Sequence, residues 1–502
     1  MSEKKAKPLM IQGTMSGAGK SLIVTALCRI FKQDGYSVAP FKSQNMALNS
    51  CVTTDGGEIG RAQAVQAEAA GKPADVRMNP ILLKPVSDRG SQVILNGKVI
   101  GDYEAKDYFR IKKDFIPHIL RAYESLEEEN DIIVIEGAGS PAEINLRQDD
   151  IVNMGLAQLI NAPVLLAGNI DPGGVFAQLY GTAELLERSE RERIRGFIIN
   201  KFRGDISLLE PGIRMIEEKT GIKVIGTIPY TDVDIDDEDS LSGRLNVKTH
   251  DKPIDIAVIR LKHISNFTDI APLEREAEIG VRYVSDADEL CKPYPDMIII
   301  PGTKNTMADL MEIRENSIEA AIKRAADKGV IILGICGGYQ MLGQKLSDPC
   351  KVEGNIPECE GMGLLPINTV FDEKKTLRRT EAEFILKEGL IAKAEGYEIH
   401  MGRSERTGGR SFSKDDAASD STVSGSVYGT YLHGLFDSGE LTEGFVRLIA
   451  QRKGIEMPKL SARNRKDYRE EQYDLLAETV RKSLDMERIY DIIFGKRTIG
   501  NA

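Results

Sequence analysis

The chain has 502 residues, of which 41% are hydrophobic and 28% charged, and its formal net charge is -11. This length is too great for one core and predicts two or three domains of an ordinary globular protein. The negative charge argues against a general electrostatic affinity for nucleic acid, and no apolar run reaches the ~18 to 20 residues that a membrane span needs.

The cysteines and the N-terminus indicate the compartment. The six cysteines form no C-x-x-C pair and lie far apart, which indicates neither a zinc site nor a disulfide framework. The lysine-rich N-terminus runs directly into a short apolar segment that lacks the form of a signal peptide. We therefore expect a cytoplasmic protein.

The first half alternates short apolar runs with helical stretches, which predicts βαβ units and a parallel sheet. A helix is expected over 21–32, closed by Gly35, and another over 60–70. The predicted strands are apolar on both faces, as buried parallel strands are, and span 9–12, 132–135, 164–167, 197–200 and 224–228.

Residues 13–21, Gly-Thr-Met-Ser-Gly-Ala-Gly-Lys-Ser, stand between the first strand and the first helix. Thr14 occupies the first glycine position of the pattern G-x-x-x-x-G-K-[ST], and Gly13 stands one place earlier. Backbone N–H groups of such a loop, together with the positive end of the helix, bind phosphate. Lys20 would meet the β- and γ-phosphates, and the Ser21 hydroxyl would ligate Mg²⁺.

The strand predicted over 132–135 ends in Glu136, followed by Gly-Ala-Gly. An acid at this position could cap a helix. The glycines after it favour close approach of a ligand at the carboxyl edge of the sheet instead. We therefore predict that Glu136 is a metal ligand.

A break follows the first half. Residues 232–239 are acidic and polar residues continue to about 252, which predicts a solvated linker, with a metal site as the alternative. A second α/β series begins there, with strands expected over 254–259, 297–300 and 330–335. Residues 411–426 predict a mobile surface loop, and the chain looks helical from 441. The predicted domains are 1–247, 252–440 and 441–502.

Cys336 stands between glycines directly after the last of these strands, in Gly-Ile-Cys-Gly-Gly-Tyr-Gln over 334–340. Glycines permit the cramped backbone that pushes one side chain out of a strand-to-helix turn, which is the form of a nucleophile elbow. A cysteine that served only as a small core hydrophobe would not need glycines on both sides. The pattern therefore predicts a reactive thiol.

The loop at 13–21 resembles the dethiobiotin synthetase-like branch of P-loop proteins. Further blocks resemble those of the cobyric acid synthase family and run in the family's order over about residues 8–440. Besides the Cys336 elbow they are FKSQNM (41–46), GEIGRAQ (57–63), NPILLKP (79–85), EGAGSP (136–141), NKFRGD (200–205), PGTKNT (301–306), GYEIHMG (396–402) and YGTYLHG (428–434).

This resemblance implies an α/β protein with an N-terminal P-loop, dethiobiotin synthetase-like parallel-sheet domain and a C-terminal class I glutamine amidotransferase-like domain. It implies ATP- and glutamine-dependent amidation of a corrinoid. The substrate would be adenosylcobyrinic acid a,c-diamide, amidated at the b, d, e and g carboxylates through acyl phosphates to give adenosylcobyric acid.

The resemblance also implies roles in the second half. Cys336 would attack glutamine, with His433 as its catalytic partner, while His400 would shape the glutamine or ring site. We interpret His118 as structural. The backbone N–H groups of Gly302, Thr303 and Gly337 are the candidates for the oxyanion hole. Ordinary class I amidotransferases carry an acid two residues after the histidine, where Leu435 stands here, so we assign no third member of the triad and leave open which residue orients His433.

In the first half the resemblance implies a nucleotide site with Asn200 at the adenine. The predicted metal ligands are Ser21, Asp55 and Glu136, Asp55 by analogy with dethiobiotin synthetase-like sites. The predicted nucleotide-binding residues are Thr14, Ser16, Gly17, Gly19, Lys20, Ser21, Lys42 and Asn200.

Two alternatives remain. The sister enzyme, cobyrinic acid a,c-diamide synthase, shares this two-domain logic, but Gln44-Asn45-Met46 and the block at 79–85 favour cobyric acid synthase. A P-loop switch ATPase of the partition type, with an inactive amidotransferase domain, would be expected to lack Cys336 or His433, and both are present.

Overall fold

The computed structural model describes residues 5–85, 90–147, 149–235, 252–354, 356–415, 420–461 and 465–495. These residues form two compact units. The first unit holds 5–46, 57–235 and 469–495, and the second holds 47–56 and 252–468. The predicted domains 1–247, 252–440 and 441–502 stay a prediction.

The first unit contains the following helices and strands. Its strands are β1 (Lys7–Gly13), β2 (Val38–Phe41), β3 (Gln44–Met46), β5 (Glu58–Gly60), β6 (Ile81–Pro85), β7 (Gly90–Leu95), β8 (Lys98–Glu104), β9 (Ile132–Glu136), β10 (Val164–Asn169), β11 (Ile194–Phe202) and β12 (Val224–Pro229). Its helices are α1 (Lys20–Gln33), α2 (Arg61–Ala69), α3 (Ala105–Ile111), α4 (Ile116–Glu129), α5 (Met154–Leu159), α6 (Val175–Leu185), α7 (Arg188–Arg191), α8 (Glu210–Thr220), most of α15 (Arg465–Ser483) and α16 (Met486–Phe494).

The central sheet of this unit has the strand order β12–β11–β10–β1–β9–β2, with every neighbouring pair parallel. Its middle strands are buried on both faces, which explains their unbroken apolar runs. The predicted strands of the first half are confirmed, and each extends one to three residues beyond at least one predicted end. A smaller sheet, β3–β6–β7–β8, carries two of the signature-like blocks.

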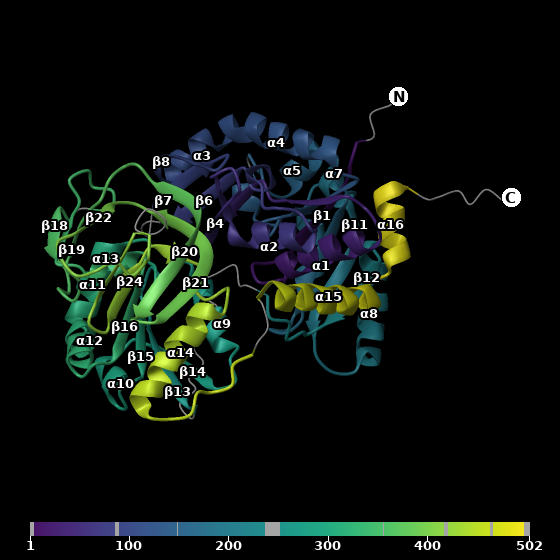
Figure 1. Cartoon of the computed structure of the whole chain (residues 1–502). Helices are drawn as coiled ribbons and strands as arrows, with labels where there is room; N and C mark the ends of the chain where they lie inside the picture. Colours follow the sequence, from purple (N-terminus) through teal and green to yellow (C-terminus); the bar gives the residue numbers. More distant parts are fainter. Residues whose placement is uncertain are drawn as a thin grey trace. The chain divides into compact units, whose positions relative to one another are not determined.

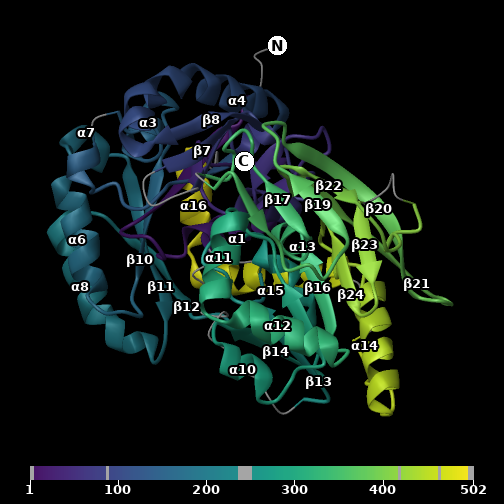
Figure 2. The ribbon, with the colours of Figure 1, turned by 90° about the vertical axis from the view of Figure 1, so that its left-hand side faces the viewer.

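Helices cover both faces of the central sheet. Leu165 and Ala167 of β10 join a core with α1, α15 and α16. Because side chains alternate along a strand, Gly168 faces the other side, where a Cβ would lie 2.7 Å from Val175 of α6. Figure 2 shows α6 and α8 together alongside β10 and β11.

The C-terminal helices α15 and α16 belong to the first unit and lie beside α1 (Figure 1). The nearly buried guanidinium of Arg29 on α1 donates to Glu470 and Asp474 of α15, each at 2.7 Å. Arg481 pairs with Asp34 at 2.8 Å. The tail is helical, as predicted, and it braces the helix that follows the phosphate loop.

The second unit contains strands β4 (Ser50–Val52), β13 (Ile254–Ile259), β14 (Ile279–Val284), β15 (Met297–Ile300), β16 (Ile331–Ile335), β17 (Lys345–Ser347), β18 (Glu358–Glu360), β19 (Ile367–Val370), β20 (Thr376–Lys387), β21 (Leu390–His400), β22 (Arg403–Arg406), β23 (Ser421–Ser424), β24 (Val427–Thr430) and β25 (Leu432–His433). Its helices include α9 (Ala271–Glu274), α10 (Ala287–Cys291), α11 (Thr306–Glu315), α12 (Ile318–Asp327), α13 (Gly337–Met341) and α14 (Glu440–Lys453).

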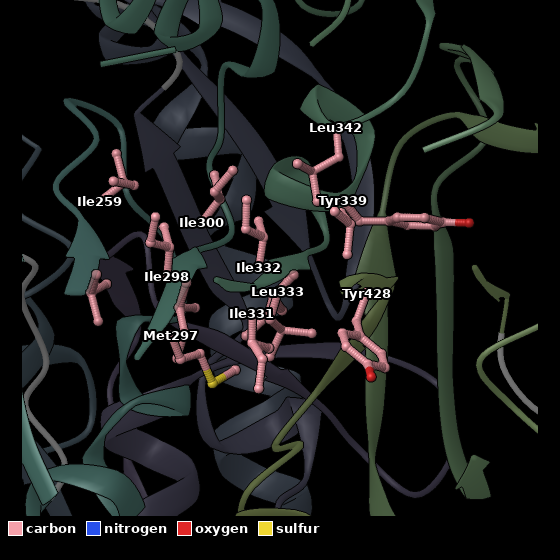
Figure 3. Close-up of a cluster of buried hydrophobic side chains, with 14 of the residues drawn as sticks. Ile259, Met297, Ile298, Ile300, Ile331, Ile332, Leu333, Tyr339, Leu342 and Tyr428 are labelled. Atoms are coloured by element: carbon pink, nitrogen blue, oxygen red, sulfur yellow. The ribbon is translucent and has the colours of Figure 1, made fainter. Parts of the chain in front are cut away.

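The main sheet here has the order β14–β13–β15–β16–β24–β23, parallel except for the edge strand β23. Figure 3 shows the isoleucines of its central strands packed together, with Tyr428 of β24 beside them. Ile298, Ile332 and Leu333 have no exposed surface. The predicted α/β class is confirmed for both units.

One predicted element is partly wrong. Ser421–Ser424 lies within the predicted surface loop over 411–426 but forms β23, which pairs with β24. Thr422 and Val423 are buried on that sheet, a tertiary contact that a Ser- and Gly-rich composition does not reveal. The acidic linker is described only to residue 235, and the rest of that prediction lies outside the described residues. In the described part of the chain, no helix is long and apolar enough to cross a membrane.

Candidate active sites

The phosphate loop follows β1 at the carboxyl edge of the first unit's sheet. Gly17 and Gly19 have φ of 75° and 87°, left-handed values that favour glycine. A Cβ at Gly19 would also lie 2.1 Å from the Asn200 side-chain nitrogen, Nδ2. The Lys20 ammonium donates to the carbonyls of Met15 and Gly139 at 3.2 and 3.1 Å. The loop therefore has the backbone form that an anion nest requires.

Side chains from neighbouring strands hold the loop in place. Asn200 of β11 donates to Ala18 O at 2.9 Å, and its own oxygen accepts from the Lys201 N–H. Asn169 of β10 donates to Gly17 O at 3.3 Å. Thr14 donates to Gln178 of α6 at 2.9 Å, while Ser16 is exposed. The Asn200 amide supports the loop here, and its contact with adenine stays a prediction.

Glu136 lies where β9 ends, beside the start of α1. Its carboxylate is 1% exposed and accepts from the Ser21 hydroxyl at 2.9 Å and from the Lys42 ammonium at 2.8 Å. Lys42 directly follows β2, the neighbour of β9, so the parallel sheet brings both side chains to one edge. The structure therefore brings together three residues that the sequence predicted for one site.

Two oxygens suited to Mg²⁺ stand side by side, because Ser21 Oγ lies 2.9 Å from Glu136 Oε1. Mg²⁺ usually takes one or two carboxylates together with phosphate oxygens and waters. Among the described residues, no group of three or more His, Cys, Asp or Glu side chains gathers that could hold a metal. The pair fits a metal held jointly with a nucleotide.

Asp55 does not belong to the unit that holds this cluster. It lies in the 47–56 segment of the second unit, is exposed, and accepts from the Thr53 hydroxyl at 2.5 Å. Its role as a metal ligand stays a prediction.

Cys336 forms the strand-to-helix elbow that the flanking glycines indicate. Its φ of 52° and ψ of -108° are strained for a residue with a side chain, and it lies directly before α13. A Cβ at Gly338 would lie 2.0 Å from the Ile300 carbonyl oxygen, so the chain can turn this tightly only with glycine there. The thiol is 7% exposed and donates to Ile399 O at 3.5 Å.

His433 reaches Cys336 because β16 and β24 are parallel neighbours whose carboxyl ends share one edge of the sheet. The Cys336 N–H donates to Thr430 O at 2.9 Å, and His433 follows three residues later. The His433 ring contacts the Cys336 thiol and stacks on Tyr397 with ring centroids 5.5 Å apart.

The acid that orients His433 is Asp269, which the sequence did not reveal. Asp269 Oδ2 lies 2.7 Å from His433 Nδ1, and Asp269 Oδ1 accepts from the Gly434 N–H at 2.8 Å. Asp269 ends a 3₁₀ turn, Phe267–Asp269, in the segment after β13, another strand of this edge. The sequence does show an acid in the segment after a predicted parallel strand, but no local pattern indicates that it contacts His433.

The charge state of His433 follows from these contacts. Burial alone would lower the pKa of its imidazole, but the Asp269 carboxylate and the Cys336 thiol outweigh burial and raise that pKa to about 10. His433 is therefore an imidazolium at neutral pH, and a cation beside a sulfur stabilises the thiolate form.

The predicted oxyanion residues lie close to Cys336 in the sequence or to His433 in space. A Cβ at Gly302 would lie 3.0 Å from His433 Cε1, and one at Gly337 would lie 3.1 Å from Thr303 N. Gly337 starts α13, where N–H groups have no partner within the helix. Gly302 thus lies beside His433, and Gly337 lies beside Thr303, while the role of the three N–H groups as donors stays a prediction.

His400 lies apart from this set. Its ring stacks on Tyr431 with centroids 3.6 Å apart, and its Nδ1 donates to Gly402 O at 3.0 Å. Tyr397, which stacks on His433, belongs to the same strand, β21, but lies on the opposite face because side chains alternate. His118 lies on α4, and its Nδ1 is 3.2 Å from the Asn96 side-chain nitrogen, Nδ2.

Known proteins resemble this chain over nearly its whole length. A family described as the CobQ/CobB/MinD/ParA nucleotide binding domain matches residues 9–241, and one described as the CobB/CobQ-like glutamine amidotransferase domain matches 255–441. Cobyric acid synthase of Ruminiclostridium cellulolyticum is 56% identical, with 97% of each chain covered. The chain belongs to the cobyric acid synthase family.

Other relatives carry the same name and match this chain over nearly its whole length. Cobyric acid synthase of Lachnoclostridium phytofermentans is 54% identical, and that of Streptococcus sanguinis is 50% identical, each with 97% of this chain and 99% of the relative covered. This family member is an enzyme of the ligase and amidotransferase kind, as the sequence predicted. Its first unit carries the nucleotide-binding domain and its second the amidotransferase domain.

Proposed function

We propose that the chain uses ATP and glutamine to amidate the b, d, e and g carboxylates of adenosylcobyrinic acid a,c-diamide, which gives adenosylcobyric acid in the cytoplasm. Family membership supports the corrinoid substrate. The observation that carries the chemistry is the Cys336–His433–Asp269 set in the second unit, together with a phosphate loop that meets Glu136 and Lys42 in the first.

The second unit would release ammonia from glutamine. The Cys336 thiolate attacks the carboxamide carbon, and the C=O electron pair moves to oxygen, where the N–H groups of Gly302, Thr303 and Gly337 would receive it. When the oxyanion collapses, the C–N bond breaks and the His433 imidazolium gives its proton to the leaving ammonia. Water then attacks the γ-glutamyl thioester and gives a proton to the neutral His433, the C–S bond breaks, and glutamate leaves with the thiolate and the imidazolium restored.

Asp269 acts through His433. By accepting from Nδ1 it keeps Nε2 directed at the sulfur and favours the charged imidazole. Its second oxygen anchors the Gly434 backbone, which limits rotation of the histidine. Asp269 would therefore serve as the acid that ordinary class I amidotransferases carry two residues after the histidine, where this chain has Leu435.

The first unit would activate the corrin carboxylates, which are poor acyl donors at neutral pH. A carboxylate oxygen attacks the γ-phosphorus, ADP leaves, and ammonia then displaces phosphate from the acyl phosphate to form the amide. Lys20 and Lys42 would offset the charge of the transferred group. Ser21 and Glu136 would hold Mg²⁺, which neutralises phosphate charge when it is bound.

The test is to follow ADP and the corrinoid mass with Mg-ATP, glutamine and adenosylcobyrinic acid a,c-diamide. Four successive mass decreases, each equal to the difference between OH and NH₂, are expected, with one ADP for each amide. Amidation of only the a and c carboxylates of unamidated cobyrinic acid would instead identify the sister enzyme. ATP hydrolysis with no change in any corrinoid mass would favour the switch ATPase and contradict the proposal.

A further inference from the structure

Three donors share the buried carboxylate of Glu136. Ser21 and Lys42 donate to Oε1, and Gln66 Nε2 of α2 donates to Oε2 at 2.5 Å. Glu136 is 1% exposed and Gln66 has no exposed surface. A buried carboxylate keeps a fixed position only while such donors hold it.

Two of these donors, Ser21 and Lys42, would also contact the magnesium nucleotide. In the proposed function Ser21 turns to the metal and Lys42 to phosphate, and both now donate to the same oxygen, Oε1. Gln66 donates to the opposite oxygen, so it can remain bound when the other two exchange partners. Of these three donors, Gln66 is therefore the one that can keep its hydrogen bond to Glu136 when the magnesium nucleotide binds.

The other end of the Gln66 amide is also informative. Its Oε1 is buried and has no hydrogen-bond partner among the described residues. An apolar side chain of equal length would fill the same space without leaving a buried acceptor unpaired. The amide is therefore better explained by its bond to Glu136 than by packing alone.

We propose that Gln66 is a positioning residue for Glu136. It fixes Oε2 so that Oε1 stays directed at Ser21 and Lys42 when the magnesium nucleotide binds. This inference rests on the proposed function, because it assumes that the first unit binds a metal–nucleotide complex.

Helix α2 supplies a matched control. Gln63 lies one turn before Gln66 and is equally buried, but its Oε1 accepts from Asn45 at 2.9 Å. Replacing either glutamine by methionine keeps the length and removes the amide, so both variants carry a similar packing change. Gln66→Met removes a hydrogen bond to Glu136, whereas Gln63→Met removes the hydrogen bond from Asn45.

The experiment measures Mn²⁺ binding to the full chain with a non-hydrolysable ATP analogue, by electron paramagnetic resonance of free Mn²⁺. Loss of a residue that orients a metal ligand typically weakens the metal about 10- to 100-fold. We expect that loss in Gln66→Met, a smaller loss in Gln66→Asn, and the original affinity in Gln63→Met. The thermal unfolding transition of the first unit, compared with that of the unaltered chain, verifies that each variant is folded.

Two results would overturn the inference. Unchanged Mn²⁺ affinity in Gln66→Met would show that Glu136 holds its position without the amide. An equal loss in Gln63→Met would assign the effect to packing of α2. If the unaltered chain bound no metal–nucleotide complex, the proposed function itself would fail, which is a separate result from either of these.

Discussion

The two candidate sites lie at the same kind of place, the carboxyl edge of a parallel sheet, but differ in how their charges are held. In the first unit Lys42, Ser21 and Gln66 all converge on one carboxylate, Glu136. In the second unit Asp269, His433 and Cys336 form a line in which each group contacts the next.

This difference matches the ligands that the two sites would receive. A nucleotide brings several negative charges, so Lys42 can exchange its ion pair with Glu136, and Ser21 its hydrogen bond, for contacts with the magnesium nucleotide. Glutamine presents an uncharged amide to the nucleophile, so the glutaminase site must generate its own charge and keep it fixed in a buried place. We therefore expect damage to one site to leave the chemistry of the other intact.

The largest expected effect is that of Cys336→Ala. Removing the nucleophile should lower glutamate release from glutamine by about 10⁴-fold or more, because the covalent step has no substitute. ADP formation supported by ammonium should continue. Glutamate release and ADP are measured in the same sample, and glutamate release near the original rate would refute the role of the thiol.

Asp269→Asn should lower the kcat of glutamine hydrolysis by about 10² to 10⁴-fold, since an amide that donates to Nδ1 selects the wrong tautomer of His433. The pH profile should also change. In the unaltered chain the raised pKa, about 10, keeps His433 charged through neutral pH. In the variant this pKa should be lower, so the loss of activity on the alkaline side should begin at a lower pH than in the unaltered chain. A merely structural role would lower the rate at every pH equally.

Lys20→Ala tests the first unit in the same way. ADP formation should fall by about 10² to 10³-fold, the usual cost of one electrostatic contact to a transferred group. Glutamine hydrolysis should be retained, because Lys20 belongs to the first unit, where it donates to Met15 of the phosphate loop and to Gly139 of the segment after β9. Normal ADP formation in the variant would show that phosphate lies elsewhere.

The C-terminal helices should matter to the first unit alone. Leu476 of α15 is 2% exposed and packs in its core, so Leu476→Ala should cost about 2 to 5 kcal/mol. Its neighbour Leu475 is 49% exposed, and Leu475→Ala should change stability by less than about 0.5 kcal/mol. The measurement is the thermal transition that a nucleotide analogue shifts upward; equal effects of the two variants would refute this packing.

The smallest expected effect is a pH dependence of stability. Because the folded-state pKa of His433 is raised above 6.5 to about 10, its pair with Asp269 stabilises the fold fully below pH 6.5, and this contribution is lost as pH rises toward 10. The difference in melting temperature between the unaltered chain and Asp269→Asn should therefore shrink over that range. A constant difference would contradict the assigned charge.

Local patterns predicted much of this molecule. The strand before Gly13, the helix after Lys20 and the elbow at Cys336 depend on neighbouring residues, so their sequence signals are strong. Glu136 and Lys42 follow strands, and a parallel sheet brings such ends together. The nucleotide-site cluster could therefore be anticipated from the sequence.

Contacts between distant segments could not be predicted in this way. Asp269 meets His433 only after the sheet assembles, and no local spacing records that pairing. Arg29 finds Glu470 and Asp474 on a helix that returns from the end of the chain. The alanine- and glutamine-rich helix α2 gave no sign that Gln66 is fully buried against Glu136.

The most direct test of two chemically separate sites is corrinoid amidation by Cys336→Ala with Mg-ATP, comparing ammonium with glutamine as the nitrogen source. We expect all four mass decreases with ammonium and none with glutamine, because the first unit retains its chemistry when the second has lost its nucleophile. Amide formation from glutamine by this variant, or no amide with either source while the unaltered chain is active, would contradict the separation of the two sites.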